Sequence, residues 1–152
     1  LKPYVVREMG GVRVGVFGLG IKLEGLNPPE SYKGVKYYDP VKVALGAVRV
    51  LREKERCAMV VCASHLGYYP NPKGDEVGDS QVAAQVDGID FFASGHTHTF
   101  MQQPVIVKQR GGGNTVIFQV GKSGIYLGRV DFTVRENKVT AYAGRLLDLR
   151  AA

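Results

Sequence analysis

Residues 57–67 read CAMVVCASHLG, and residues 87–100 read DGIDFFASGHTHTF. Each stretch holds an apolar run, CAMVVCAS or IDFFAS, that is followed within two residues by histidine. Unbroken apolar runs of this length are typical of strands buried on both faces of a parallel sheet. His65 and His96 lie 31 residues apart (96 − 65), which is enough for a helical crossover between parallel strands. We therefore predict two neighbouring parallel strands whose carboxyl ends carry histidines.

Strand and helix patterns alternate along the first two thirds of the chain. Val12–Phe17 (VRVGVF) is apolar and β-branched, which favours a strand. Asp39 followed by Pro40 predicts a helix start, and the next apolar positions share one helix face: Val41, Ala44, Leu45, Val48 and Leu51. Asp79 is expected to cap a short helix over residues 80–86. The alternation predicts an α/β fold.

The pattern changes after residue 100. Short apolar stretches are separated by the turn sequences GGGN, GKSG and REN, and they are predicted to pair as an antiparallel meander or as hairpins. These stretches are PVIVKQ (104–109), TVIFQV (115–120), YLGRVDFTV (126–134) and KVTAYAGRLLDL (138–149).

Composition excludes several classes of protein. With 152 residues, 45% hydrophobic and 22% charged, the chain has the size and composition of one globular domain. The longest apolar run has seven residues, against the roughly 18 that a membrane helix needs, so no membrane span is expected. The net charge of +6 is spread over the chain. Its densest basic cluster, in residues 49–56, is interleaved with Glu53 and Glu55, which predicts a solvated helix face and no nucleic-acid partner.

The two cysteines and the first residues carry little functional information. Cys57 and Cys62 are five positions apart, so in one strand their side chains would point to opposite faces. We therefore expect them to be small core residues with no disulfide bond between them. Residues 1–11 (LKPYVVREMGG) lack a long apolar segment and do not begin with Met. We expect that these residues do not form a signal peptide and that the chain is part of a longer protein.

The chain has only three histidines, and all three follow the predicted strand ends. His65 comes after the first strand, and His96 and His98 come after the second, within GHTH. Imidazole is a ligand for Zn, Fe, Mn, Ni or Cu, and Gly95 is expected to let the backbone turn tightly around a site. The alternative is a polar loop whose histidines bind the backbone. Because two strand ends supply histidines to one sheet edge, the metal site is favoured.

Acidic residues between the histidines are weaker candidates for further ligands. Asp75, Glu76 and Asp79 follow His65, but loop solvation and helix capping are the favoured explanations for them. Two glycine motifs also fail as nucleotide sites. GVFGLG (15–20) lacks the glycine required at position 23, and Gly121-Lys122-Ser123 lacks the one required at position 116.

In order along the chain, GVRVGVFGLG, DPVKVA, VVCASHLG, DSQVAAQVDGIDFFASGHTHTF, TVIFQVG and GIYLGRVDF resemble the calcineurin-like metallophosphoesterases. The chain is most similar to the 5′-nucleotidase branch, which includes UDP-sugar hydrolases and 2′,3′-cyclic nucleotide phosphodiesterases. The resemblance implies the C-terminal half of a four-layered α/β/β/α sandwich, with βαβ units followed by antiparallel strands.

The resemblance also implies a site and a reaction. His65 and His96 correspond to ligands of one metal ion and His98 to a ligand of a second, the two being divalent ions such as Zn, Mn or Fe. Such a pair activates a water that hydrolyses the phosphate ester of a nucleotide. Members of the branch are usually exported, which implies the periplasm or the cell surface.

The family's upstream motifs are missing from this sequence. DxH, GDxxD and GNHE are absent, and no histidine remains to supply them. The resemblance places the catalytic residue on that upstream segment, so none is assigned here. We expect residues 1–152 to be one incomplete metallophosphoesterase domain, completed by an N-terminal fragment or chain and weakly active or inactive alone. The alternative is a non-catalytic module that binds metal or a partner through its open sheet edge.

Overall fold

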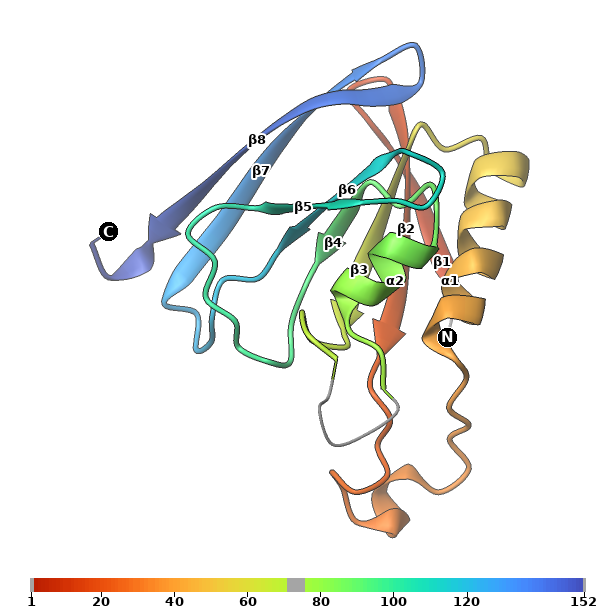
Figure 1. Ribbon diagram of the computed structural model, residues 1–152, viewed down its shortest axis with the longest axis vertical. Helices are drawn as coiled ribbons and strands as arrows, with labels where there is room; N and C mark the ends of the chain where they lie inside the picture. Colours follow the sequence, from red (N-terminus) through yellow and green to blue (C-terminus); the bar gives the residue numbers. More distant parts are fainter. Residues whose placement is uncertain (1, 71–75, 152) are drawn as a thin grey trace.

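The computed structural model describes residues 2–70 and 76–151, and in these ranges a six-stranded sheet has the order β1-β2-β3-β4-β6-β5 (Figure 1). Its strands are β1 (Tyr4–Met9), β2 (Val12–Gly20), β3 (Met59–His65), β4 (Phe91–Ala93), β5 (Val105–Lys108) and β6 (Asn114–Phe118). A separate two-stranded sheet pairs β7 (Tyr126–Arg135) with β8 (Lys138–Asp148). The helices are α1 (Pro40–Arg49), continued by a π-helical turn (Val50–Lys54), and α2 (Asp79–Gln85), with 3-10 turns at Pro29–Tyr32 and Leu149–Ala151.

The middle of the large sheet is parallel. β2 pairs with β3, β3 with β4 and β4 with β6 in parallel, which confirms the predicted neighbouring strands before the histidines. The prediction of purely antiparallel pairing after residue 100 is wrong for β6, since only its other partner, β5, is antiparallel. Val116, Ile117 and Phe118 are all buried, and a strand that is apolar on both faces fits the covered centre of the sheet.

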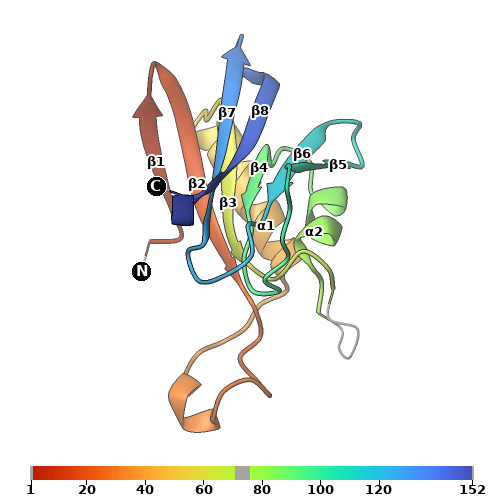
Figure 2. The same cartoon turned by 90° about the vertical axis from the view of Figure 1, so that its left-hand side faces the viewer.

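Helices cover one face of this sheet and the β7–β8 hairpin lies over the other, as the side view shows (Figure 2). The side chains of successive residues in β4 point to opposite faces of the sheet. Phe92 is fully buried in the main core, whereas the ring of Phe91 meets that of Phe132 of β7 at a centroid distance of 5.4 Å. Alternation along a strand therefore serves both contacts. The described residues thus form three of the layers in the predicted α/β/β/α arrangement.

Helix α1 begins as predicted. The Asp39 carboxylate accepts hydrogen bonds from the amides of Val41 (2.8 Å) and Lys42 (3.1 Å), which caps the helix. Ala44 and Val48 are buried, but Leu45 is half exposed, so the predicted apolar face is too wide by one residue.

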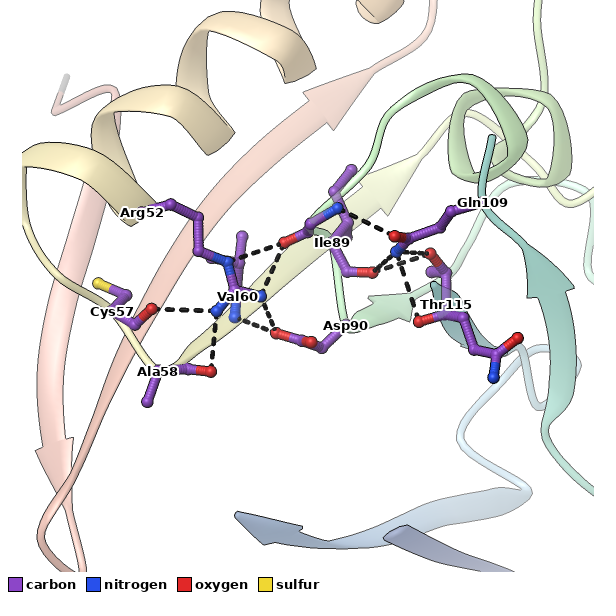
Figure 3. A network of polar contacts seen from close by, with 10 residues as sticks. Arg52, Cys57, Ala58, Val60, Ile89, Asp90, Gln109 and Thr115 are labelled. Carbon is purple, nitrogen blue, oxygen red and sulfur yellow. Dashed lines mark hydrogen bonds and ion pairs between the residues drawn. The ribbon is translucent and has the colours of Figure 1, made fainter. Parts of the chain in front are cut away.

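Arg52 contradicts the prediction of a solvated basic face over residues 49–56. Its guanidinium donates to the carbonyl oxygens of Cys57 (3.0 Å), Ala58 (2.8 Å) and Gly88 (2.9 Å) and to the Asp90 carboxylate (2.6 Å), as Figure 3 shows. The π-helical turn places Arg52 at the amino ends of β3 and β4. The backbone carbonyls just before these strands need hydrogen-bond donors, and Arg52 supplies them. A charged side chain therefore joins two strands here.

Both cysteines are buried and free, as expected, although Cys57 lies before β3 rather than within it. Burial raises the pKa of both thiols. In the described part of the chain, no helix is long and apolar enough to cross a membrane.

Candidate functional site

The carboxyl ends of β3 and β4 bring two histidines together. His65 is the last residue of β3, and His96 follows three residues after the end of β4. Their ring centroids lie 5.3 Å apart, with the ring planes tilted by 58°. His65 is exposed and His96 half-buried, so both can be reached from solvent. The prediction that the parallel strands place these histidines at one sheet edge is confirmed.

The loop after β4 has an unusual backbone. His96 (φ 77°) and His98 (φ 52°) are both left-handed, a region that few residues other than glycine adopt. Gly95 is not left-handed, so a positive φ is not the reason for glycine at this position. Its hydrogen side chain is needed for close approach, because a Cβ at Gly95 would lie 3.0 Å from Nδ1 of His65.

The surroundings of His96 favour its neutral form. Burial lowers the pKa of His96, and repulsion from His65 and His98 acts in the same direction, while Glu76 opposes them. A lowered pKa favours the neutral imidazole, which is the form that binds a metal ion.

The two adjacent imidazoles fit part of a metal site. Imidazole nitrogen suits Zn, Mn and Fe, and a tetrahedral ion needs about four ligands. Among the described residues, no group of three or more His, Cys, Asp and Glu side chains gathers closely enough to hold a metal ion. His98 is exposed on the same loop. Of the weaker acidic candidates, Asp75 lies outside the described residues.

Asp79 has a role that differs from the predicted cap. Gly78 is the N-cap of α2, and Asp79 is fully buried as the first residue of the helix. Its carboxylate accepts hydrogen bonds from the hydroxyls of Ser64 (2.5 Å) and Ser94. Desolvation raises the pKa of Asp79 to about 6, although the two serines and His65 lower it. The carboxylate thus joins the residue before His65 to the loop before His96.

Gln119 also belongs to this edge, and sequence reasoning missed it. It is 1% exposed, directly after β6, and its side chain binds the loop that carries His96 and His98. The available signal was an amide inside the apolar stretch TVIFQV, next to the predicted strand end.

A cavity of about 560 Å³ opens beside His65. The long segment after β2 forms most of its wall. This segment extends from the end of the molecule toward which β2, β3 and β4 point (Figure 1). The lining includes Gly20, Leu23, Tyr32, Val35, Tyr37 and His65. The histidine edge therefore adjoins a concave and mostly apolar surface.

The chain is similar to several known proteins, both in sequence and in structure. The trifunctional nucleotide phosphoesterase protein YfkN of Bacillus subtilis is 27% identical over 139 residues, 91% of this chain. Its structure, called a calcineurin-like phosphoesterase, matches 97% of this chain with a TM-score of 0.68 at 19% identity. The 5′-nucleotidase precursor of Thermus thermophilus matches 96% of the chain, with 27% identity and a TM-score of 0.78. The sulfate thiohydrolase SoxB of Thermus thermophilus matches 98%, with 25% identity and a TM-score of 0.83. No protein-family model matches the chain.

The chain is thus similar in sequence and in fold to calcineurin-like phosphoesterases, as the motifs predict. Within that class its homologues are nucleotide phosphoesterases and 5′-nucleotidases. The chain spans 9% of the length of YfkN and 29% of the Thermus 5′-nucleotidase structure.

Proposed function

We propose that this chain takes part in hydrolysing the phosphate ester of a nucleotide at a metal site on the β3–β4 edge. The observation that carries the proposal is the contact between the His65 and His96 rings, in a chain related to nucleotide phosphoesterases over nine tenths of its length. The likeness to a 5′-nucleotidase at a TM-score of 0.78 supports the same reaction class.

Each histidine has a role in this proposal. His65 and His96 bind one divalent ion through neutral imidazole nitrogens, and the lowered pKa of His96 maintains that form near neutral pH. His98 binds a second ion. Two such ions supply charge that neutralises the phosphoryl oxygens and lowers the pKa of the attacking water. Zn, Mn and Fe all accept this donor set.

We propose further that residues 1–152 form an incomplete domain and that an upstream segment completes the site. Two imidazoles at 5.3 Å are too few ligands for a closed site, so additional donors have to come from elsewhere. The Thermus relative is described as a precursor, which supports an exported location for the whole protein.

Complementation tests this proposal. The chain is mixed with the segment that precedes the matching region in the Thermus 5′-nucleotidase, Mn²⁺ or Zn²⁺ is added, and phosphate release from a nucleoside monophosphate is measured. We expect release that depends on both parts and is lost in His65→Ala and His96→Ala. No phosphate release, together with unchanged metal content in both variants, would refute the proposal.

The alternative is a non-catalytic module that binds a partner through an open strand edge. Within the described residues, β7 and β8 pair only with each other, so each has an outer edge without a strand partner. Native mass spectrometry of the purified chain separates the two functions. A monomer without metal favours the module, whereas bound metal favours the phosphoesterase.

A further inference from the structure

We propose that Gln119 is a positioning residue that sets the conformation of the loop carrying His96 and His98, and that Asp79 fixes this loop to His65. The inference rests on the proposed function, since it concerns the same metal ligands. Both side chains are buried, and each acts by holding this loop in place without touching a metal or a substrate.

The side-chain hydrogen bonds of Gln119 all lead to one short segment, residues 94–99. Its amide nitrogen donates to the hydroxyl of Ser94 (2.8 Å) and to the carbonyl of Gly95 (2.7 Å). Its amide oxygen accepts from the hydroxyl of Thr97 (3.0 Å) and from the backbone amide of Thr99. In the described residues these are the four bonds that a side-chain amide can make, two as donor and two as acceptor.

The chemistry of these partners fixes the orientation of the amide. The Gly95 carbonyl can only accept, and the Thr99 amide can only donate. A flipped amide would place its oxygen against the carbonyl oxygen of Gly95 and its nitrogen against the backbone amide of Thr99. Because the bonds bracket His96 and His98 on both sides, Gln119 holds the two left-handed residues between fixed points. Such backbone is retained where the surroundings over-determine it.

The same network reaches the His65 loop by two routes. Asp79 receives hydrogen bonds from Ser64, directly before His65, and from Ser94, which also binds Gln119. By the second route, the hydroxyl of Thr97 accepts from the backbone amide of Tyr68 (3.2 Å). The distance between the two imidazoles is therefore set by the buried Asp79 and Gln119 together with the hydroxyl of Thr97.

The chain offers a matched control at the opposite end of the sheet. Gln109 donates to the carbonyl of Ile89 (2.8 Å) and the hydroxyl of Thr115 (2.9 Å), and it accepts from the amide of Gly88 (3.1 Å), as Figure 3 shows in part. It joins β4 to β6 as Gln119 does, but at their amino ends. Gln109→Leu therefore removes a similar set of hydrogen bonds away from the histidines.

The test compares Gln119→Leu, Gln109→Leu and the wild-type chain. Titration calorimetry gives the dissociation constant for Mn²⁺ or Zn²⁺, and NMR hydrogen exchange follows the amides of Thr99 and Gly88. We expect Gln119→Leu to weaken metal binding about tenfold or more, the size typical for residues behind metal ligands, and to speed exchange at Thr99. Gln109→Leu should speed exchange at Gly88 and leave metal binding within about twofold of wild type. Thr97→Val, which removes one hydroxyl from the loop surface, gives the same comparison if Gln119→Leu does not fold.

The outcomes separate this inference from the proposed function. Equal weakening of metal binding by both glutamine variants would overturn the inference, because general destabilisation would then explain it. Unchanged exchange at Thr99 in Gln119→Leu would overturn it as well. If the wild-type chain binds no metal, the metal role fails, and exchange at Thr99 still decides whether Gln119 positions the loop.

Discussion

Asp79 makes the stability of this protein depend on pH in a way that can be isolated. In the folded protein the pKa of Asp79 is about 6, raised from 3.8 mainly by desolvation. Between these two values the folded chain holds a proton that the unfolded chain has released. The free energy of unfolding therefore falls as pH rises through this window. Replacing Asp79 with Asn removes the titrating group and keeps its shape.

The size of the effect follows from the pKa difference. A shift from 3.8 to about 6 corresponds to about 3 kcal/mol at 1.36 kcal/mol per unit. The stability of the wild-type chain minus that of Asp79→Asn should thus fall by up to about 3 kcal/mol from about pH 4 to about pH 7. Taking the difference removes the contributions of Asp90, whose pKa burial also raises, and of His96, whose pKa is lowered.

Urea unfolding at several pH values provides the measurement. The chain contains no tryptophan, so far-ultraviolet circular dichroism is the suitable probe. Asp131→Asn serves as the control, because Asp131 is exposed on β7 and pairs with Arg129 on the surface. A stability difference that stays flat across this window, or that grows with pH, would show that the ionised Asp79 carboxylate is not penalised by burial.

Three further changes test the scaffold by thermal or urea unfolding. Asp39→Ala removes the cap of α1 and should cost about 1 kcal/mol; no loss would mean that the cap is redundant. Arg52→Met leaves the largely buried Asp90 carboxylate without its cation and should cost about 3 kcal/mol, part of which Asp90→Asn should restore in the double variant. Gly144→Ala places a methyl group against the ring of Pro104 and should cost about 1–3 kcal/mol, because a proline ring cannot rotate away; an unchanged midpoint would contradict this contact.

The sequence predicts those features whose signals are local. Unbroken apolar runs identify β3 and β4, and histidines directly after them locate the sheet edge. The Asp39-Pro40 pair is sufficient to place the start of α1. Strand β1 carries no comparable signal, since it is a mostly exposed edge strand.

The missed features depend on partners that are distant in the sequence. Asp79 looks the same in sequence whether it caps a helix or turns inward, and each of its two serine partners is 15 residues away. In the sequence Arg52 is one charge among many, because its acceptors, three backbone carbonyls and the Asp90 carboxylate, come together only when β3 and β4 have paired. Sequence periodicity reports burial and not the identity of a polar partner, so such networks become visible only in the fold.

The position of Gln119 has a consequence for how the chain matures during synthesis. The histidines come first in the chain, and the side chain that holds their loop follows about 20 residues later, as the separation of Thr99 and Gln119 shows. A chain emerging from the ribosome therefore displays His65 and His96 before their spacing can be set. Because a domain generally folds as a unit, His65 and His96 acquire their final spacing only when β6 joins the sheet. The two imidazoles thus reach their separation of 5.3 Å only after residue 119 has been synthesised.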